Sequence, residues 1–115
     1  MVEDDAPLRE LYRGSLSAQR YRVLSASDGL SALEIIERDR PDVVVLDLGL
    51  PLVSGWDVYR ELRSRAETKK IRVVIVTGND LQDIREQDVV SFLQKPVDPD
   101  AVSLAVDEAV RRSHW

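Results

Sequence analysis

The chain contains no cysteine, and this absence excludes disulfides, thiolate catalysis and zinc sites built on thiolates. A chain without cysteine suits reducing and oxidising compartments equally, so its compartment must be inferred from other features. Histidine is nearly absent too: His114 stands alone in a polar tail beside Trp115. We expect it to be neither a metal ligand nor a phosphodonor.

Long hydrophobic runs are also missing. The longest apolar runs are four residues, whereas a membrane-spanning helix needs about 18 or more. Residues 1–5 include three acids, Glu3, Asp4 and Asp5, and no basic side chain, which is the reverse of the basic start of a signal peptide. We therefore expect no membrane contact and a cytoplasmic location.

Basic residues are outnumbered by acidic ones, 16 to 21, which gives a net charge of −5. A surface that wraps a nucleic acid needs clustered Lys and Arg, so we expect no direct nucleic-acid binding. A local basic cluster between residues 63 and 72 is most simply a solvated face, with a partner surface as the alternative. The length of 115 residues matches one domain of roughly 100–150 residues, and we expect residues 1–115 to form it.

Apolar spacing predicts alternating helices and strands. Helical spacing predicts a helix over residues 7–19, and a short strand is expected at residues 21–26. An apolar stripe that includes Leu30 predicts a second helix, which residues 39–41 terminate with their proline. Residues 43–48 begin with four consecutive apolar side chains, as expected of a strand buried on both faces.

The second half of the chain continues this alternation. Strands that alternate with helices are typical of a doubly wound α/β fold with a parallel sheet, and this is the fold class that we predict. The remaining expected elements are, in order, a helix carrying Val58, Leu62 and Ala66, a strand at 71–76, a short helix at 81–87, a strand at 89–93 and a helix opened by 98–100.

Charged and polar residues stand where the expected strands end. Asp47 closes an unbroken apolar run at residues 43–46, and Thr77 and Lys95 follow two later strands. Glu3 and Asp4 lie close to the start of the chain. In parallel α/β sheets, ligands gather at the carboxyl ends of the strands. Asp47 is therefore the candidate reactive group.

These residues resemble the receiver domain of two-component response regulators, and the resemblance covers essentially the whole chain. One such motif alone is weak evidence, but four of them in the right order at strand ends are specific. The resemblance implies a flavodoxin-like three-layer sandwich and a phosphoacceptor without enzyme activity beyond slow autodephosphorylation. The motifs that carry it are Glu3-Asp4, Asp47-Leu48-Gly49-Leu50-Pro51 with Gly55, Thr77-Gly78 and Lys95-Pro96.

Phosphoryl transfer to Asp47 needs a nucleophile that is ionised at neutral pH, and an exposed Asp with a pKa near ~3.9 meets this need. The donor and the carboxylate repel each other, so a hard cation such as Mg²⁺ is expected between them. Asp4, Asp47 and the backbone carbonyl of Gly49 would supply its ligands, with Glu3 acting directly or through water.

The resemblance also implies roles for three later residues. Thr77 would donate a hydroxyl hydrogen bond to the phosphoryl group, and Lys95 would place a positive charge on a phosphoryl oxygen. Phe92 occupies the position of an aromatic whose rotation follows Thr77. Because Phe92 has no hydroxyl group, a switch that used it would act through packing alone.

Structural roles are the competing interpretation of each residue. Glu3 and Asp4 could belong to an ordinary acidic terminus, Thr77 could cap a following helix, and Asp47 could stabilise a turn. Lys95 could be a solvated lysine, and Phe92 is more simply a packed aromatic.

The first strand of the resembled fold is nearly missing, because only Met1 and Val2 precede Glu3, whereas strands commonly need ~5 residues. In the receiver family this strand is central, and its loss would expose edges and apolar surface on both neighbours. Three explanations remain open: a start that has been cut short, re-pairing of the neighbouring strands, or a second chain that fills the gap.

Three function classes follow. The leading one is a receiver that takes its phosphoryl group from a histidine kinase or phosphotransfer protein and then engages a downstream protein target, with a homodimer as one outcome. Since no output module follows Trp115, it would be a stand-alone regulator or an excised receiver. The alternative is a pseudo-receiver, a protein interaction module that is never phosphorylated. A metal-dependent phosphohydrolase would need a second acid at position 49, which is Gly49.

Overall fold

Three parallel strands form the sheet of the computed structural model, which describes residues 1–50, 53–77, 89–94 and 98–113. The strands are β1 (Val43–Asp47), β2 (Arg72–Thr77) and β3 (Val89–Gln94), in the order β1-β2-β3. Asp47 pairs with Val76, and Thr77 pairs with Gln94. The register therefore brings the carboxyl ends of all three strands to one edge of the sheet.

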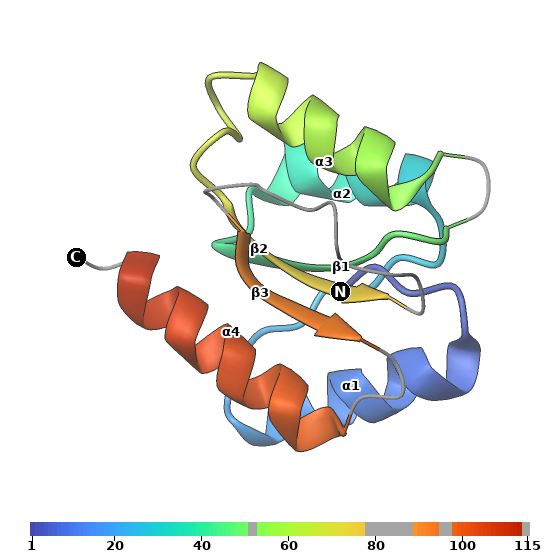
Figure 1. The fold of residues 1–115 in the computed structure, drawn as a ribbon, viewed down its shortest axis with the longest axis vertical. Coiled ribbons are helices and arrows are strands. Elements are labelled where there is room, and N and C mark those ends of the chain that lie inside the picture. The colour runs from blue at the N-terminus through green and yellow to red at the C-terminus, as the bar shows by residue number, and fades with distance from the viewer. Residues whose placement is uncertain (51–52, 78–88, 95–97, 114–115) are drawn as a thin grey trace.

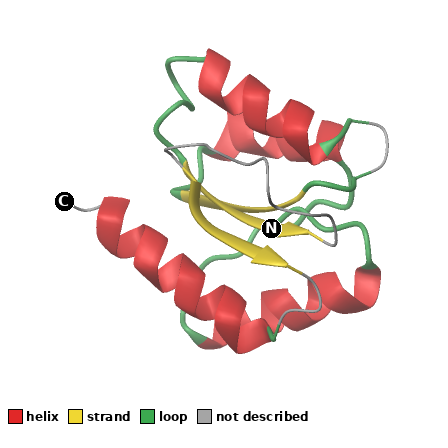
Figure 2. Cartoon of the chain, in the orientation of Figure 1, coloured by secondary structure: helices red, strands yellow, loops and turns green. Residues whose placement is uncertain are grey.

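Four helices cover the two faces of this sheet in the described part of the chain (Figure 1). Helices α2 (Gly29–Asp39) and α3 (Gly55–Ser64) lie on one face, and α1 (Ala6–Ala18) and α4 (Pro99–Ser113) lie on the other. Figure 2 shows the resulting three layers, with the strands between two pairs of helices. The prediction of a doubly wound parallel α/β fold is confirmed.

The sheet buries side chains on both faces, as the unbroken apolar runs of its strands predicted. Successive residues of a strand point to opposite faces, so each run is divided between two apolar clusters. The cluster beneath α2 and α3 takes Val44, Leu46, Val73 and Ile75, and the cluster beneath α1 and α4 takes Val45, Val74 and Val76.

Capping side chains set the start of the first two helices. The Asp5 carboxylate accepts a hydrogen bond from the Leu8 amide at 3.1 Å, and Asp28 accepts one from Ser31 at 2.8 Å. Such caps satisfy amide groups that have no partner within the helix. Arg40, with φ 48°, ends α2 in the left-handed region. The two helices were therefore placed to within a residue or two by the sequence.

Two details of the helix predictions are wrong. Leu30 is 51% exposed, and α2 instead buries Ala32 and Ile36. Helix α3 ends at Ser64, so Ala66 is neither helical nor buried. Thr68 replaces it, because its buried hydroxyl donates to the carbonyl of Leu62 at 2.7 Å and ties the chain back onto the end of α3.

The start of the sheet differs from expectation as well. Residues 21–26 form no regular strand, and only Ala26 of this segment makes a bridge, to Val2. Val2 also bridges Leu46 in parallel, so it lies between the 21–26 segment and β1. The neighbouring strands have therefore not re-paired. Without a regular partner strand, the 21–26 segment lacks the ladder that would make it a strand.

The predicted helix at 81–87 lies outside the described residues. Within the described ranges, no helix combines the length and the hydropathy that crossing a membrane would require.

Candidate functional site

Three acidic side chains meet at the edge where the strands end. Carboxylate oxygens of Glu3, Asp4 and Asp47 lie within 4.8 Å of one another. Their meeting depends on Val2, whose amide donates to the Val45 carbonyl at 2.7 Å and whose carbonyl accepts from the Asp47 amide at 3.0 Å. These two bonds align the first residues of the chain with the end of β1. The structure thus brings together the three acids that the sequence singled out.

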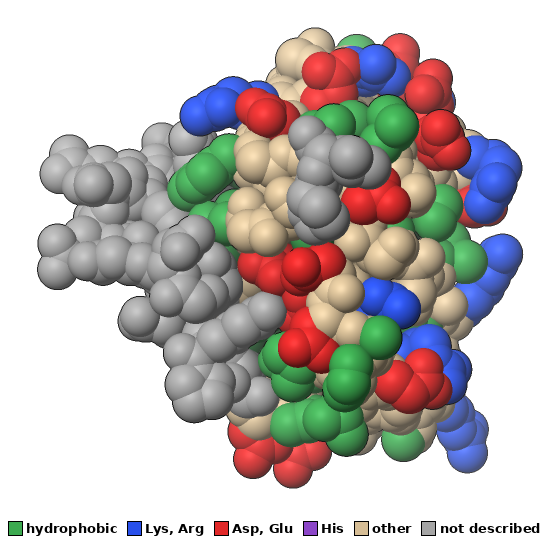
Figure 3. Space-filling model, turned by 90° about the vertical axis from the view of Figure 1, so that its right-hand side faces the viewer, with side chains coloured by type: hydrophobic (Ala, Val, Ile, Leu, Met, Phe, Trp, Pro, Cys, Tyr) green, Lys and Arg blue, Asp and Glu red, His purple; other side chains and the backbone are tan. Residues whose placement is uncertain are grey.

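Burial makes this acidic cluster costly without a counter-ion. Glu3 is 2% exposed and Asp47 is 6% exposed, while Asp4 faces the solvent. Asp47 is therefore not the exposed acid that its position at a strand end led us to expect. Figure 3 looks onto this edge of the sheet and shows acidic side chains gathered in the middle of the face. Carboxylates this close repel one another, and a nearby cation offsets that repulsion. A set of oxygen donors with an open side fits a hard cation such as Mg²⁺.

Short polar contacts hold the cluster in place. The Gly49 amide donates to Asp47 Oδ1 at 3.0 Å, which orients the carboxylate at the end of β1. The guanidinium of Arg9, one turn into α1, donates to the Glu3 carbonyl at 2.9 Å. Sequence reasoning missed Arg9, because no spacing rule relates a helical arginine to a backbone oxygen outside its helix.

The loop after Asp47 returns to the site through Gly55. The Gly55 amide donates to the carbonyl of Leu48 at 3.1 Å, and the Ser54 hydroxyl caps α3 by accepting from Asp57 at 3.2 Å. Trp56 in the first turn of α3 packs on the apolar core and meets Tyr59 edge-on, with ring centroids 6.0 Å apart. Trp56 therefore covers part of the apolar core.

The other predicted site residues are described less fully. Thr77 is the last residue of β2, and Phe92 lies within β3 opposite Ile75, but neither side chain is described. Lys95, Gly78 and Pro96 lie outside the described residues. Gln94 pairs with Thr77, and Lys95 is the next residue in the sequence.

Two members of the basic cluster at residues 63–72, Arg63 and Arg65, have partners within the fold. Arg63 donates from one nitrogen to the carbonyls of Lys69 and Ile71, both at 2.9 Å, and its guanidinium lies 4.9 Å from the centre of the Tyr59 ring. Arg65 pairs with Glu61 at 2.7 Å and with Glu37 at 3.5 Å. These contacts account for both arginines within the fold.

Comparison with known proteins decides the family. The family model described as the response regulator receiver domain matches residues 1–107. The chain belongs to this family. Receiver domains are the phosphoacceptors of two-component signal transduction: they bind Mg²⁺ at an acidic pocket and interact with histidine kinases and downstream effectors. This receiver domain has an acidic cluster of Glu3, Asp4 and Asp47.

Named relatives agree with this assignment. The response regulator MprA of Mycobacterium leprae is 43% identical over 79 residues, covering 69% of this chain and 34% of the relative. The transcriptional regulatory protein GlrR of Escherichia coli is 30% identical over 115 residues, covering 98% of this chain and 26% of the relative. The chain thus spans about a third or less of these relatives' length.

Solved structures show the same fold. A response regulator receiver domain protein from Clostridium thermocellum matches with a TM-score of 0.86 and 27% identity, covering 98% of this chain and 93% of that one. The flavodoxin-like arrangement predicted from the sequence is therefore confirmed by structural similarity as well as by the order of the strands.

Proposed function

We propose that Asp47 accepts a phosphoryl group from a phosphohistidine of a histidine kinase or phosphotransfer protein. A carboxylate oxygen of Asp47 attacks the phosphorus, the new P–O bond forms as the P–N bond to the imidazole breaks, and the leaving nitrogen takes up a proton. The observation that carries this proposal is the meeting of Asp47 with Glu3 and Asp4 within 4.8 Å at the carboxyl end of β1.

The carboxylates of Asp4 and Asp47 would hold Mg²⁺, with Glu3 beside them and the Gly49 carbonyl as a further oxygen ligand. When bound there, Mg²⁺ offsets the charge of the acids and of the phosphoryl oxygens. The bond from the Gly49 amide to Asp47 Oδ1 at 3.0 Å holds one oxygen of the acceptor. The orientation of the other carboxylate oxygen is therefore fixed before the phosphoryl donor binds.

Thr77 and Lys95 complete the site in this proposal. Thr77 follows the partner of Asp47 in β2, and Lys95 follows the partner of Thr77 in β3. Neighbouring strands lie about 4.8 Å apart, and this spacing is the reason for proposing that a hydroxyl and an ammonium from these two positions act beside Asp47. Thr77 would donate to a phosphoryl oxygen, and Lys95 would pair with another.

Phosphorylation adds a charge of roughly −1.5 to −2 at Asp47. It can shift the equilibrium between two conformations of a surface only as far as the contacts of the phosphoryl group differ between the two conformations. We assign the coupling to Thr77 and Phe92, the latter acting through packing on β3. The surface so altered would engage a downstream protein or a second copy of the chain.

The test is incubation with acetyl phosphate, with and without Mg²⁺, followed by intact mass. We expect one added phosphoryl group that requires Mg²⁺ and disappears in Asp47→Asn. Asp42→Asn is the matched control, because Asp42 is an exposed acid just before the other end of β1. Modification of Asp47→Asn, or none in a folded wild-type chain, would contradict the proposal.

A pseudo-receiver is the second candidate, and one observation favours it: the chain reaches Glu3 and Asp4 through a single bridged residue, Val2, and not through a regular strand. A site held by so short a ladder would be looser than one on a full strand. Beryllofluoride with Mg²⁺, read by Trp56 fluorescence, separates the two functions. A saturable change supports phosphoacceptance, and a folded chain without one supports the interaction module.

A further inference from the structure

The guanidinium of Arg9 contacts the backbone between two of the three acids. Arg9 is half-buried in the first part of α1, and its Nη1 donates to the Glu3 carbonyl at 2.9 Å. This carbonyl belongs to the peptide unit that joins Glu3 to Asp4, and a peptide unit is planar and stiff. A single contact from Arg9 therefore acts on the orientation of both acids.

Backbone hydrogen bonds bring this peptide unit to the end of β1. The Val2 carbonyl accepts from the Asp47 amide at 3.0 Å, and the Glu3 amide donates to the Ala26 carbonyl at 3.1 Å. The Glu3 carbonyl is the next polar group along the backbone, and Arg9 is its donor. The guanidinium thus adds one further bond to the set that aligns the acids with Asp47.

The start of α1 fixes where Arg9 lies. The Asp5 side chain caps the helix by accepting from the Leu8 amide at 3.1 Å, and the Asp5 carbonyl accepts from the Arg9 amide at 2.8 Å. Together with the bond from Arg9 to Glu3, these contacts close the segment of residues 3–9 into a ring. A rotation of the peptide unit between Glu3 and Asp4 would have to break the Arg9 contact.

The charge of Arg9 is not neutralised by an acid on its own helix. Within the described part of the chain Arg9 forms no ion pair, whereas the exposed Arg13, one turn later, pairs with Glu10. A guanidinium beside a group of carboxylates offsets part of their mutual repulsion. The same charge repels a divalent cation that binds among them.

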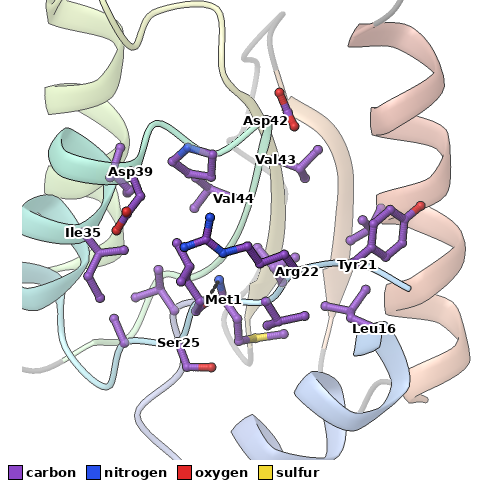
Figure 4. Close-up of a pocket in the computed structure, with 18 of the residues that line it drawn as sticks. Met1, Leu16, Tyr21, Arg22, Ser25, Ile35, Asp39, Asp42, Val43 and Val44 are labelled. Carbon is purple, nitrogen blue, oxygen red and sulfur yellow. Dashed lines mark hydrogen bonds between the residues drawn. The ribbon is translucent and has the colours of Figure 1, made fainter. Parts of the chain in front are cut away.

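Arg22 is another arginine in the first part of the chain, and it lies elsewhere. Figure 4 shows its side chain beside Met1, where it lines a cavity of about 270 Å³. Val43 and Val44, from the start of β1, also line this cavity, and none of the three acids does. Arg9 is therefore distinguished from Arg13 and Arg22 by its contact and not by its charge.

We propose that Arg9 is a positioning residue of the Mg²⁺ site, which holds the peptide unit between Glu3 and Asp4 in the orientation that brings both acids to Asp47. This inference rests on the proposed function, because it requires Mg²⁺ to bind at these acids. Removing a group that orients metal ligands commonly weakens metal binding by roughly 10–100-fold. The hydrogen bond of Arg9 thus favours Mg²⁺ binding while its charge opposes it, and we assign the larger effect to the hydrogen bond.

The test compares Arg9→Met with Arg13→Met. Both variants remove one positive charge from α1 and keep an unbranched side chain that suits a helix. Mg²⁺ titration followed by Trp56 fluorescence measures the affinity. We expect Arg9→Met to bind Mg²⁺ roughly tenfold more weakly than the wild type, and Arg13→Met to bind it as tightly. Arg9→Lys keeps the charge and a donor but not the planar guanidinium, so its affinity should lie between those of the wild type and Arg9→Met.

A second measurement needs no metal. The nitrogen chemical shift of the Asp4 amide reports on hydrogen bonding to the Glu3 carbonyl, because the two groups share one peptide unit. In the metal-free protein, we expect this shift to change in Arg9→Met and to stay the same in Arg13→Met.

Two results would overturn the inference. One is Mg²⁺ binding by Arg9→Met that is as tight as binding by Arg13→Met, or tighter, because only the charge of Arg9 would then matter to the site. The other is an unchanged Asp4 shift in folded Arg9→Met. Failure of the proposed function would look different, because the wild-type chain itself would then take no phosphoryl group from acetyl phosphate, whatever residue stands at position 9.

Discussion

A Cβ atom on Gly55 would lie 2.2 Å from the carbonyl oxygen of Asp47 and 2.5 Å from the Cα of Leu48. Both neighbours are backbone atoms of the segment that carries the acceptor, so neither can turn aside as a flexible side chain would. The start of α3 therefore lies against the end of β1 at a distance that only glycine allows.

Gly55→Ala is expected to lower the free energy of unfolding by about 1–3 kcal/mol, the usual cost of overpacking, and to slow phosphorylation of Asp47. Urea unfolding measures the first effect, and intact mass after acetyl phosphate measures the second. Gly14→Ala is the control. Position 14 lies in α1 with nothing within 4 Å of a Cβ, so alanine there should stabilise the chain by up to about 1 kcal/mol. Equal effects of the two variants would contradict this account.

Asp4→Asn removes one negative charge from the acidic cluster. We expect the metal-free protein to become more stable, because repulsion falls, and Mg²⁺ to bind roughly tenfold more weakly, a change of about 1.4 kcal/mol. Mg²⁺ titration followed by Trp56 fluorescence and by thermal unfolding measures both. Asp5→Asn is the matched control, since Asp5 caps α1 and Asn caps a helix equally well. Weaker Mg²⁺ binding in both variants would remove Asp4 from the site.

The lowered pKa of the Met1 amino group predicts that the stability of the protein depends on pH. Its pKa falls from 8.0 to about 6 in the fold, so between these values the unfolded chain binds the proton more tightly. Stability should therefore drop as the pH falls from 8 to 6, by about 2–3 kcal/mol, and level off below 6. Urea unfolding at several pH values measures this slope.

The control for this pH dependence is the chain acetylated on Met1, which should lack the slope. Both chains should carry His114→Gln, because a histidine also titrates in this range. The same slope with and without the acetyl group would show that another group causes it.

Thr68→Val removes the hydroxyl that donates to Leu62 at the end of α3. Because Thr68 is buried, the variant leaves a helix carbonyl without this donor, and we expect a loss of about 1–2 kcal/mol in the free energy of unfolding. Thr68→Ser keeps the hydroxyl and should lose less. Urea unfolding of both variants measures the two losses, and a loss in Thr68→Ser as large as that in Thr68→Val would contradict the assignment of the effect to the hydroxyl group.

The order of the elements and the three residues of the acidic cluster could be predicted from the sequence. Apolar runs such as residues 43–46 are local patterns, and so are the caps at Asp5 and Asp28, since each reflects interactions among neighbouring residues. Asp47 could be singled out for the same reason, because a charge that ends a buried run is visible without any distant contact.

Tertiary structure decided what depends on residues far apart in the chain. Leu30 has helical spacing yet is exposed. Thr68 is buried at the end of α3, where Ala66 was expected to be, because burial depends on which surface another element covers. The same holds for Val2: one residue aligns Glu3 and Asp4 with Asp47 only because the carbonyl of Val45 and the amide of Asp47 are there to bond it. No local pattern in the first residues contains that information.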